Sequence, residues 1–137
     1  MRCAATHDRR GHVGWIDYFN DRPTAAVRRL DSLLSSELVL IGDLILAGVL
    51  QGFRSDHDFR RALALLSALE FQAMVGREVA LDSARNYRRL RARGISVRKT
   101  IAVMIGTFCI NNGHRLLHVY RDFDPMEHHR GLRVVPV

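Results

Sequence analysis

The chain has 137 residues, of which 47% are hydrophobic, which is enough for one folded domain with a core and argues against a disordered chain. Its net charge of +7 comes almost wholly from arginine, because Lys99 is the only lysine, and this balance favours an RNA, DNA or acidic protein partner. A GC-rich genome also yields many arginines, so a plain solvated basic surface stays an alternative.

Apolar residues recur with helical or strand-like spacing along most of the chain after an irregular start. Pro23 suits the first turn of a helix, and Asp43 is predicted to be the N-cap of another. Gly94 and Gly113 are expected to end two later helices. In chain order the pattern predicts a helix at 25–34, a strand at 37–42, a helix at 43–50, an amphipathic segment at 59–69, a strand at 71–75, helices at 78–93 and 100–110, a strand at 115–119 and an edge strand at 132–135.

Short apolar runs that alternate with longer helical segments favour an α/β fold, in which helices cover a parallel sheet. Residues 125–131 are expected to form a loop or a frayed turn. Within it, His128 and His129 beside Glu127 are interpreted as solvated residues, because adjacent side chains rarely point at one metal ion. His114 and His118 are interpreted as structural residues of the strand at 115–119.

The two cysteines, Cys3 and Cys109, lie far apart and form no C-x-x-C pair, and no histidine cluster has zinc-ligand spacing. We expect a buried thiol at Cys109. No segment approaches roughly 18 uninterrupted apolar residues, and the first residues include no apolar stretch that would serve as a signal sequence. The prediction is a cytoplasmic protein with no membrane partner.

Five short strings, in this order and spacing, resemble the landmarks of VapC-type PIN domains, the ribonuclease toxins of type II toxin–antitoxin systems. They are W-I-D-Y-F at 15–19, I-G-D-L-I-L-A at 41–47, V-L-Q-G-F at 49–53, V-R-K-T-I at 97–101 and R-D-F-D at 121–124. The resemblance implies a PIN-like parallel sheet with helices on both faces. It also implies a Mg²⁺- or Mn²⁺-dependent endoribonuclease, a VapB-type antitoxin partner and a homodimer.

The acids that hold the metal ion in that family are missing from this chain. By the family pattern their positions fall at Gly11, Gly48, Ala102 and Tyr120. Hard divalent ions require oxygen ligands, so neutral side chains cannot replace the acids. Asp122 is the one acid that matches a position near the family site. We interpret it as a structural residue rather than a ligand, because a lone carboxylate binds Mg²⁺ poorly.

Two functional hypotheses therefore stand. The first is a catalytically degenerate VapC-like protein, and the second is a non-catalytic protein that sequesters a VapB-type antitoxin or RNA. One helix face carries an arginine stripe that suits contact with RNA or with an acidic antitoxin, and a solvated face explains the stripe equally well. The stripe consists of Arg85, Arg88, Arg89, Arg91 and Arg93.

The family's first strand and first acid have no counterpart directly before Trp15. Codons compatible with residues 6–14 can be read in another frame as M-I-V-V-D-T-S-V, which resembles the start of a PIN domain. We therefore divide the chain into an irregular segment at 1–14, hypothesised to be out of frame, and a PIN-like domain at 15–137. The first strand is expected to be replaced or disordered, because residues 9–12 lack the apolar, β-branched content of a buried strand.

Overall fold

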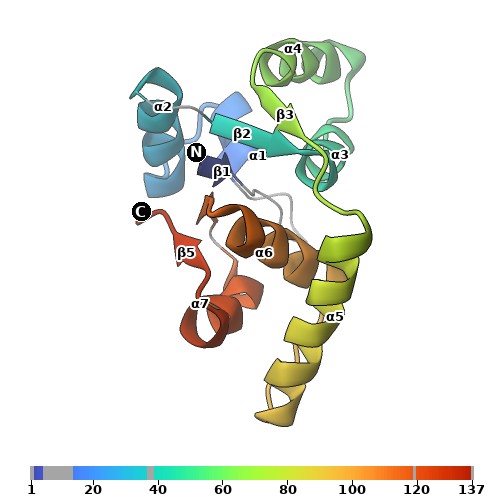
Figure 1. The fold of residues 1–137 in the computed structure, drawn as a ribbon. Helices are drawn as coiled ribbons and strands as arrows, with labels where there is room; N and C mark the ends of the chain where they lie inside the picture. The colour runs from blue at the N-terminus through green and yellow to red at the C-terminus, as the bar shows by residue number, and fades with distance from the viewer. Residues whose placement is uncertain (1, 5–13, 37–38, 119, 137) are drawn as a thin grey trace.

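The computed structural model describes residues 2–4, 14–36, 39–118 and 120–136. Its centre is a five-stranded sheet with the order β3-β2-β1-β4-β5, in which every neighbouring pair is parallel (Figure 1). The predicted α/β class with a parallel sheet is confirmed. The strands are β1 (Arg2–Ala4), β2 (Val39–Gly42), β3 (Glu70–Gln72), β4 (Arg115–Leu117) and β5 (Arg133–Val134).

Helices surround these short strands, and α5 projects away from the sheet (Figure 1). They are α1 (Gly14–Phe19), α2 (Ala25–Ser36), α3 (Asp43–Leu50), α4 (Asp56–Ser67), α5 (Arg77–Ala92), α6 (Thr100–Asn112), the 3₁₀ helix η1 (Arg121–Phe123) and α7 (Asp124–Arg130). The helices predicted at 25–34, 43–50, 78–93 and 100–110 are therefore confirmed. Gly94 and Gly113 adopt positive φ angles of 78° and 69°, as expected of the glycines that follow α5 and α6. No helix among the described residues has the length and apolarity needed to cross a membrane.

Residues 2–4 occupy the central place in the sheet. Cys3 pairs in register with Leu40 of β2 on one side and with Leu116 of β4 on the other. Of the two outcomes expected for the first strand, the structure therefore shows replacement. Three residues are too few for a period-2 pattern, which is why the sequence did not predict β1. Residues 9–12 lie outside the described part of the chain, and the division at residue 14 and the frame-shift hypothesis stay predictions.

The loop predicted at 125–131 is wrong, because residues 124–130 form helix α7. Pro125 lies in the first turn, where its missing amide hydrogen costs nothing, and Gly131 ends the helix with a φ of 78°. Met126 is fully buried, and its side chain packs over Gly106 of α6, where an added Cβ would lie 3.1 Å from Met126 Cε. Tertiary packing thus stabilises a helix that local sequence patterns did not reveal.

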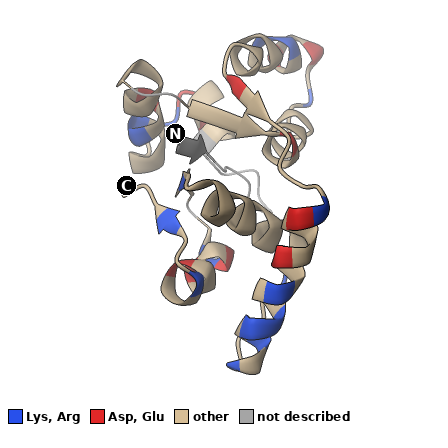
Figure 2. Ribbon diagram, viewed as in Figure 1, with Lys and Arg blue, Asp and Glu red and all other residues tan. Residues whose placement is uncertain are grey.

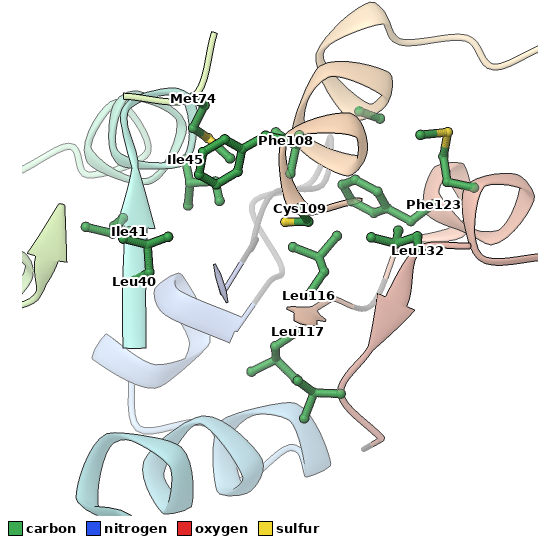
Figure 3. Packing of buried hydrophobic residues seen from close by; sticks show 14 of the residues in the cluster. Leu40, Ile41, Ile45, Met74, Phe108, Cys109, Leu116, Leu117, Phe123 and Leu132 are labelled. Carbon is green, nitrogen blue, oxygen red and sulfur yellow. The ribbon is translucent and has the colours of Figure 1, made fainter. Parts of the chain in front are cut away.

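The core is formed by side chains from the sheet and from α6, which has seven buried residues. Figure 3 shows Leu116 of β4 beside Cys109 of α6, and the Phe108 ring of α6 beside Ile45 and Met74. The Cys109 side chain is fully buried, which confirms the predicted buried thiol.

Candidate functional site

Three of the four positions at which the sequence resemblance predicts missing acids line one pocket. Gly48 comes from α3, Ala102 from the first turn of α6, and Tyr120 from the residue before η1. The pocket has a volume of about 300 Å³. Gly11, the fourth position, lies outside the described residues. The described lining consists of Leu44, Ile45, Ala47, Gly48, Gln51, Lys99, Ile101, Ala102, Ile105, Tyr120 and Phe123.

This pocket is apolar and carries a positive charge. None of its described lining residues is Asp or Glu, and its one cationic side chain is Lys99. The Lys99 Nζ lies 5.0 Å from the centroid of the Tyr120 ring, which is within the range of a cation–π contact. A divalent cation needs several anionic or carbonyl oxygens, and a neighbouring ammonium repels it. These lining residues therefore do not fit Mg²⁺ or Mn²⁺.

Asp43, the acid nearest to Gly48 in α3, has a structural role. Its Oδ1 accepts hydrogen bonds from the backbone amides of Leu44 at 2.8 Å and Met74 at 3.0 Å. The predicted N-cap is displaced by one residue, because Gly42 occupies that position and Asp43 is the first helical residue. The carboxylate still satisfies an amide at the start of α3, and it ties that start to the segment after β3.

Asp122, the sequence-predicted metal candidate, lies half-buried in η1 between two pocket residues, Tyr120 and Phe123. It is not among the residues that line the pocket. Asp122 therefore lies close to Tyr120 in the sequence, but its side chain does not line the pocket. Its role as a ligand stays a prediction.

Sequence reasoning missed a grouping of His118, Asp124 and Glu127, whose donor atoms lie within 4.8 Å of one another. The backbone amide of Tyr120 donates to His118 Nδ1 at 3.0 Å, so the neutral ring carries its proton on Nε2. A metal ion on Nε2 would have to displace that proton. Burial lowers the pKa of His118, although the charges of Asp124 and Glu127 act in the opposite direction. The grouping therefore suits a partly buried structural histidine better than a metal site.

We interpret His114 as structural, and His128 and His129 as solvated. His114 is buried, and its ring centroid lies 5.4 Å from that of Phe108. His128 and His129 are exposed on α7, and His129 Nδ1 lies 3.4 Å from an Arg93 guanidinium nitrogen. Glu127 belongs to the same helix but groups with His118 instead of with its histidine neighbours.

The five arginines of the predicted stripe are all exposed along α5 and just after it. Figure 2 shows basic residues gathered on the half of α5 that lies far from the sheet, and acidic residues at its beginning. Arg85 donates to Asp82 at 2.9 Å, and the Arg91 guanidinium lies 5.6 Å from the centroid of the Tyr87 ring. Hydrogen bonds from Asn111 and Arg85 lower the pKa of Asp82. The stripe is a basic surface suited to anions.

No protein-family sequence profile matches the chain. Its fold is similar to a chain of the VapBC2 complex from Rickettsia felis bound to a DNA fragment from its promoter, with a TM-score of 0.70 at 15% identity over 98% of both chains. It is also similar to a chain of DNA-bound VapBC from Salmonella typhimurium, with a TM-score of 0.63 at 17% identity over 98% of this chain and 97% of that one. At these identities the likeness shows a shared fold across the whole described molecule.

Proposed function

We propose that this chain is a VapC-like PIN-domain protein that no longer cleaves RNA and acts by binding a partner in the cytoplasm. Two lines support the family: the order and spacing of the five sequence strings, and the fold shared with chains of two VapBC complexes. One observation carries the loss of activity. Gly48, Ala102 and Tyr120 meet in one pocket, where the resemblance places three metal-binding acids.

The chemistry of the pocket explains why cleavage is lost. When bound, Mg²⁺ or Mn²⁺ activates water and neutralises charge that develops on the phosphate, but it needs oxygen ligands. The described lining offers aliphatic and aromatic groups, one amide, one phenol and one ammonium instead. Lys99 cannot substitute for a divalent ion, because a single ammonium has no vacant coordination site for water and lowers the pKa of water far less than a bound divalent ion does. The described lining of this pocket therefore supplies none of the carboxylates with which the family holds its metal ion.

The partner we propose is a VapB-type antitoxin, because both structural neighbours are chains of VapBC complexes. A protein that retains the fold but has lost the acids would compete with active toxins for antitoxin. RNA is the second candidate partner, favoured by the exposed arginine stripe. A homodimer belongs to the same proposal, by resemblance to the family.

Cleavage of total RNA with Mg²⁺ or Mn²⁺ tests the loss of activity. The control variant combines Gly11→Asp, Gly48→Glu, Ala102→Asp and Tyr120→Asp with the alternative N-terminal strand before Trp15. We expect cleavage by the control and none by the chain itself. Cleavage by the chain as it stands would overturn the proposal, because it would require a metal site formed by other carboxylates.

Size-exclusion chromatography with candidate VapB-type antitoxins tests the partner. We expect a complex that survives in Mg²⁺-free buffer, because binding does not depend on the lost acids. Two separate elution peaks would contradict the antitoxin assignment and leave RNA as the partner to examine.

A further inference from the structure

We propose that the pocket between α3, α6 and Tyr120 binds a small apolar anion, that is, a hydrocarbon or aromatic body that carries one carboxylate or sulfonate. The inference deepens the proposed function, since it rests on the pocket being free of a divalent ion. The proposed ligand is an anion, and it occupies the place at which the family resemblance predicts a metal cation.

The walls of the pocket define the body of this ligand. Aliphatic and aromatic side chains from α3, α6 and η1 form most of the lining, and the volume of about 300 Å³ lies at the lower end of the range for small-molecule sites. Burial of apolar surface against such walls is favourable. A single ring system or a short branched chain is therefore the expected size.

The charges around the pocket define its head group. Lys99 is the one cation of the described lining, and no described acid lines the pocket to neutralise it. The Tyr120 ring holds the ammonium at the pocket wall through their 5.0 Å contact. Helix α6 begins at Thr100 beside Lys99 with no acidic residue in its first turn and no side-chain cap, so its dipole adds to the positive potential. One negatively charged group near Lys99 would interact favourably with this positive potential.

A ligand can reach the pocket past Ile101. This side chain is 52% exposed although it lines the pocket, so it forms part of the rim, whereas Ala102 is only 5% exposed and forms the wall. A nucleic acid strand fits the pocket less well, because a strand presents many phosphates to one lysine. The arginine stripe of α5 is the surface that suits such a strand.

Titration calorimetry and amide NMR shifts of the full-length chain test the proposal with three probes that share the naphthalene ring system and differ in the charge of the head group. The probes are naphthalene-2-sulfonate, naphthalene-2-methanol and naphthalene-2-methylammonium. We expect saturable binding of the sulfonate, with at least about tenfold weaker binding of the ammonium probe. The amide shifts should involve Gly48 and Ala102. Equal affinity for all three probes, or shifts that never saturate, would overturn the proposal.

Variants separate the pocket from general electrostatics. Lys99→Gln should remove the preference for the sulfonate, whereas Arg98→Gln, an equal loss of charge at the adjacent exposed residue, should keep it. Ala102→Leu should prevent binding of all three probes, because the larger side chain occupies space inside the pocket. Ile101→Glu is a second variant that changes only the exposed rim and should weaken sulfonate binding by about tenfold. Equal effects of Lys99→Gln and Arg98→Gln would overturn the assignment of the head group.

The probes and the RNA cleavage assay report on separate claims. A chain that neither cleaves RNA nor binds the sulfonate keeps the proposed function and loses this inference. A chain that cleaves RNA with Mn²⁺ loses the proposed function, whatever the probes show.

Discussion

At the scale of single residues, His118 links stability to pH. Burial lowers the pKa of its ring below the ordinary value of 6.5, so the unfolded chain binds this proton more readily than the folded chain. The folded state therefore loses stability as the pH falls through about 6.5. We expect His118→Gln to reduce the drop in Tm between pH 7 and pH 5, measured by circular dichroism at both values.

A matched control is His128→Gln, which removes an exposed histidine from the neighbouring helix. It should leave the pH dependence of Tm as it is in the parent chain. If His118→Gln also leaves it unchanged, then Asp124 and Glu127 offset the burial of His118 fully, and the ring titrates as it does in water.

The same residue scale shows what the sequence can predict of a site. The resemblance places the family's acid positions at Gly48, Ala102 and Tyr120, and these three residues line one pocket. Their equivalence to the family's metal ligands stays a prediction. The importance of Lys99 could not be predicted, because its contact with Tyr120 joins residues 21 positions apart. Local patterns carry no information on such pairs. The grouping of His118 with Asp124 could not be predicted either, because residues 125–131 are predicted to form a loop and not the helix that carries Asp124.

At the scale of secondary-structure elements, Asn86 joins three helices. Its Nδ2 donates to Thr107 Oγ1 of α6 at 3.0 Å, and Arg130 Nε of α7 donates to its Oδ1 at 3.0 Å. Asn86 and Thr107 are buried, so loss of the amide leaves polar groups without partners. We expect Asn86→Ala to lower the free energy of unfolding by about 1–3 kcal/mol in urea titrations.

Asn111→Ala is the control for this change. Asn111 also links α6 to α5, through a 2.9 Å hydrogen bond to Asp82, but both partners are at the surface of the molecule. Its loss should cost less than about 0.5 kcal/mol. Equal costs for the two variants would mean that burial does not distinguish the two hydrogen bonds.

Strand β1 is the second element whose contribution can be measured. Cys3 lies in register between β2 and β4, and a proline there removes an amide donor from the centre of the sheet. We expect Cys3→Pro to abolish the cooperative thermal transition, and Cys3→Ala, which keeps the amide, to retain it. A Cys3→Pro chain that melts like the parent would mean that residues 2–4 do not hold the sheet together.

The elements also show where prediction from sequence ends. Long periodic helices such as α5 and α6 could be predicted to within a few residues, because many positions contribute to the pattern. The three-residue strand β1 and the seven-residue helix α7 could not. Short elements of this kind form because their neighbours supply partners: two flanking strands in one case and the Gly106 surface in the other.

At the scale of the whole molecule, part of the net charge of +7 lies on α5, so the proposed RNA binding and its salt dependence can be tested at one surface. Each phosphate that an arginine neutralises releases counterions, with a slope of about −0.7 in log K against log salt for single strands. We expect the combined variant Arg88→Gln, Arg89→Gln and Arg91→Gln to flatten the slope for a single-stranded RNA by about 2. Fluorescence anisotropy between roughly 50 and 200 mM salt measures it.

The decisive comparison is a triple variant with the same loss of charge elsewhere: Arg54→Gln, Arg60→Gln and Arg98→Gln, all at exposed positions. Net charge alone would make the two triple variants equivalent, because the long-range field depends on the total charge. A contact surface on α5 makes them differ, because only neutralised phosphates release counterions. Equal slopes would assign the arginine stripe to solvation, whereas a flatter slope for the α5 variant alone would make this helix the RNA-binding surface.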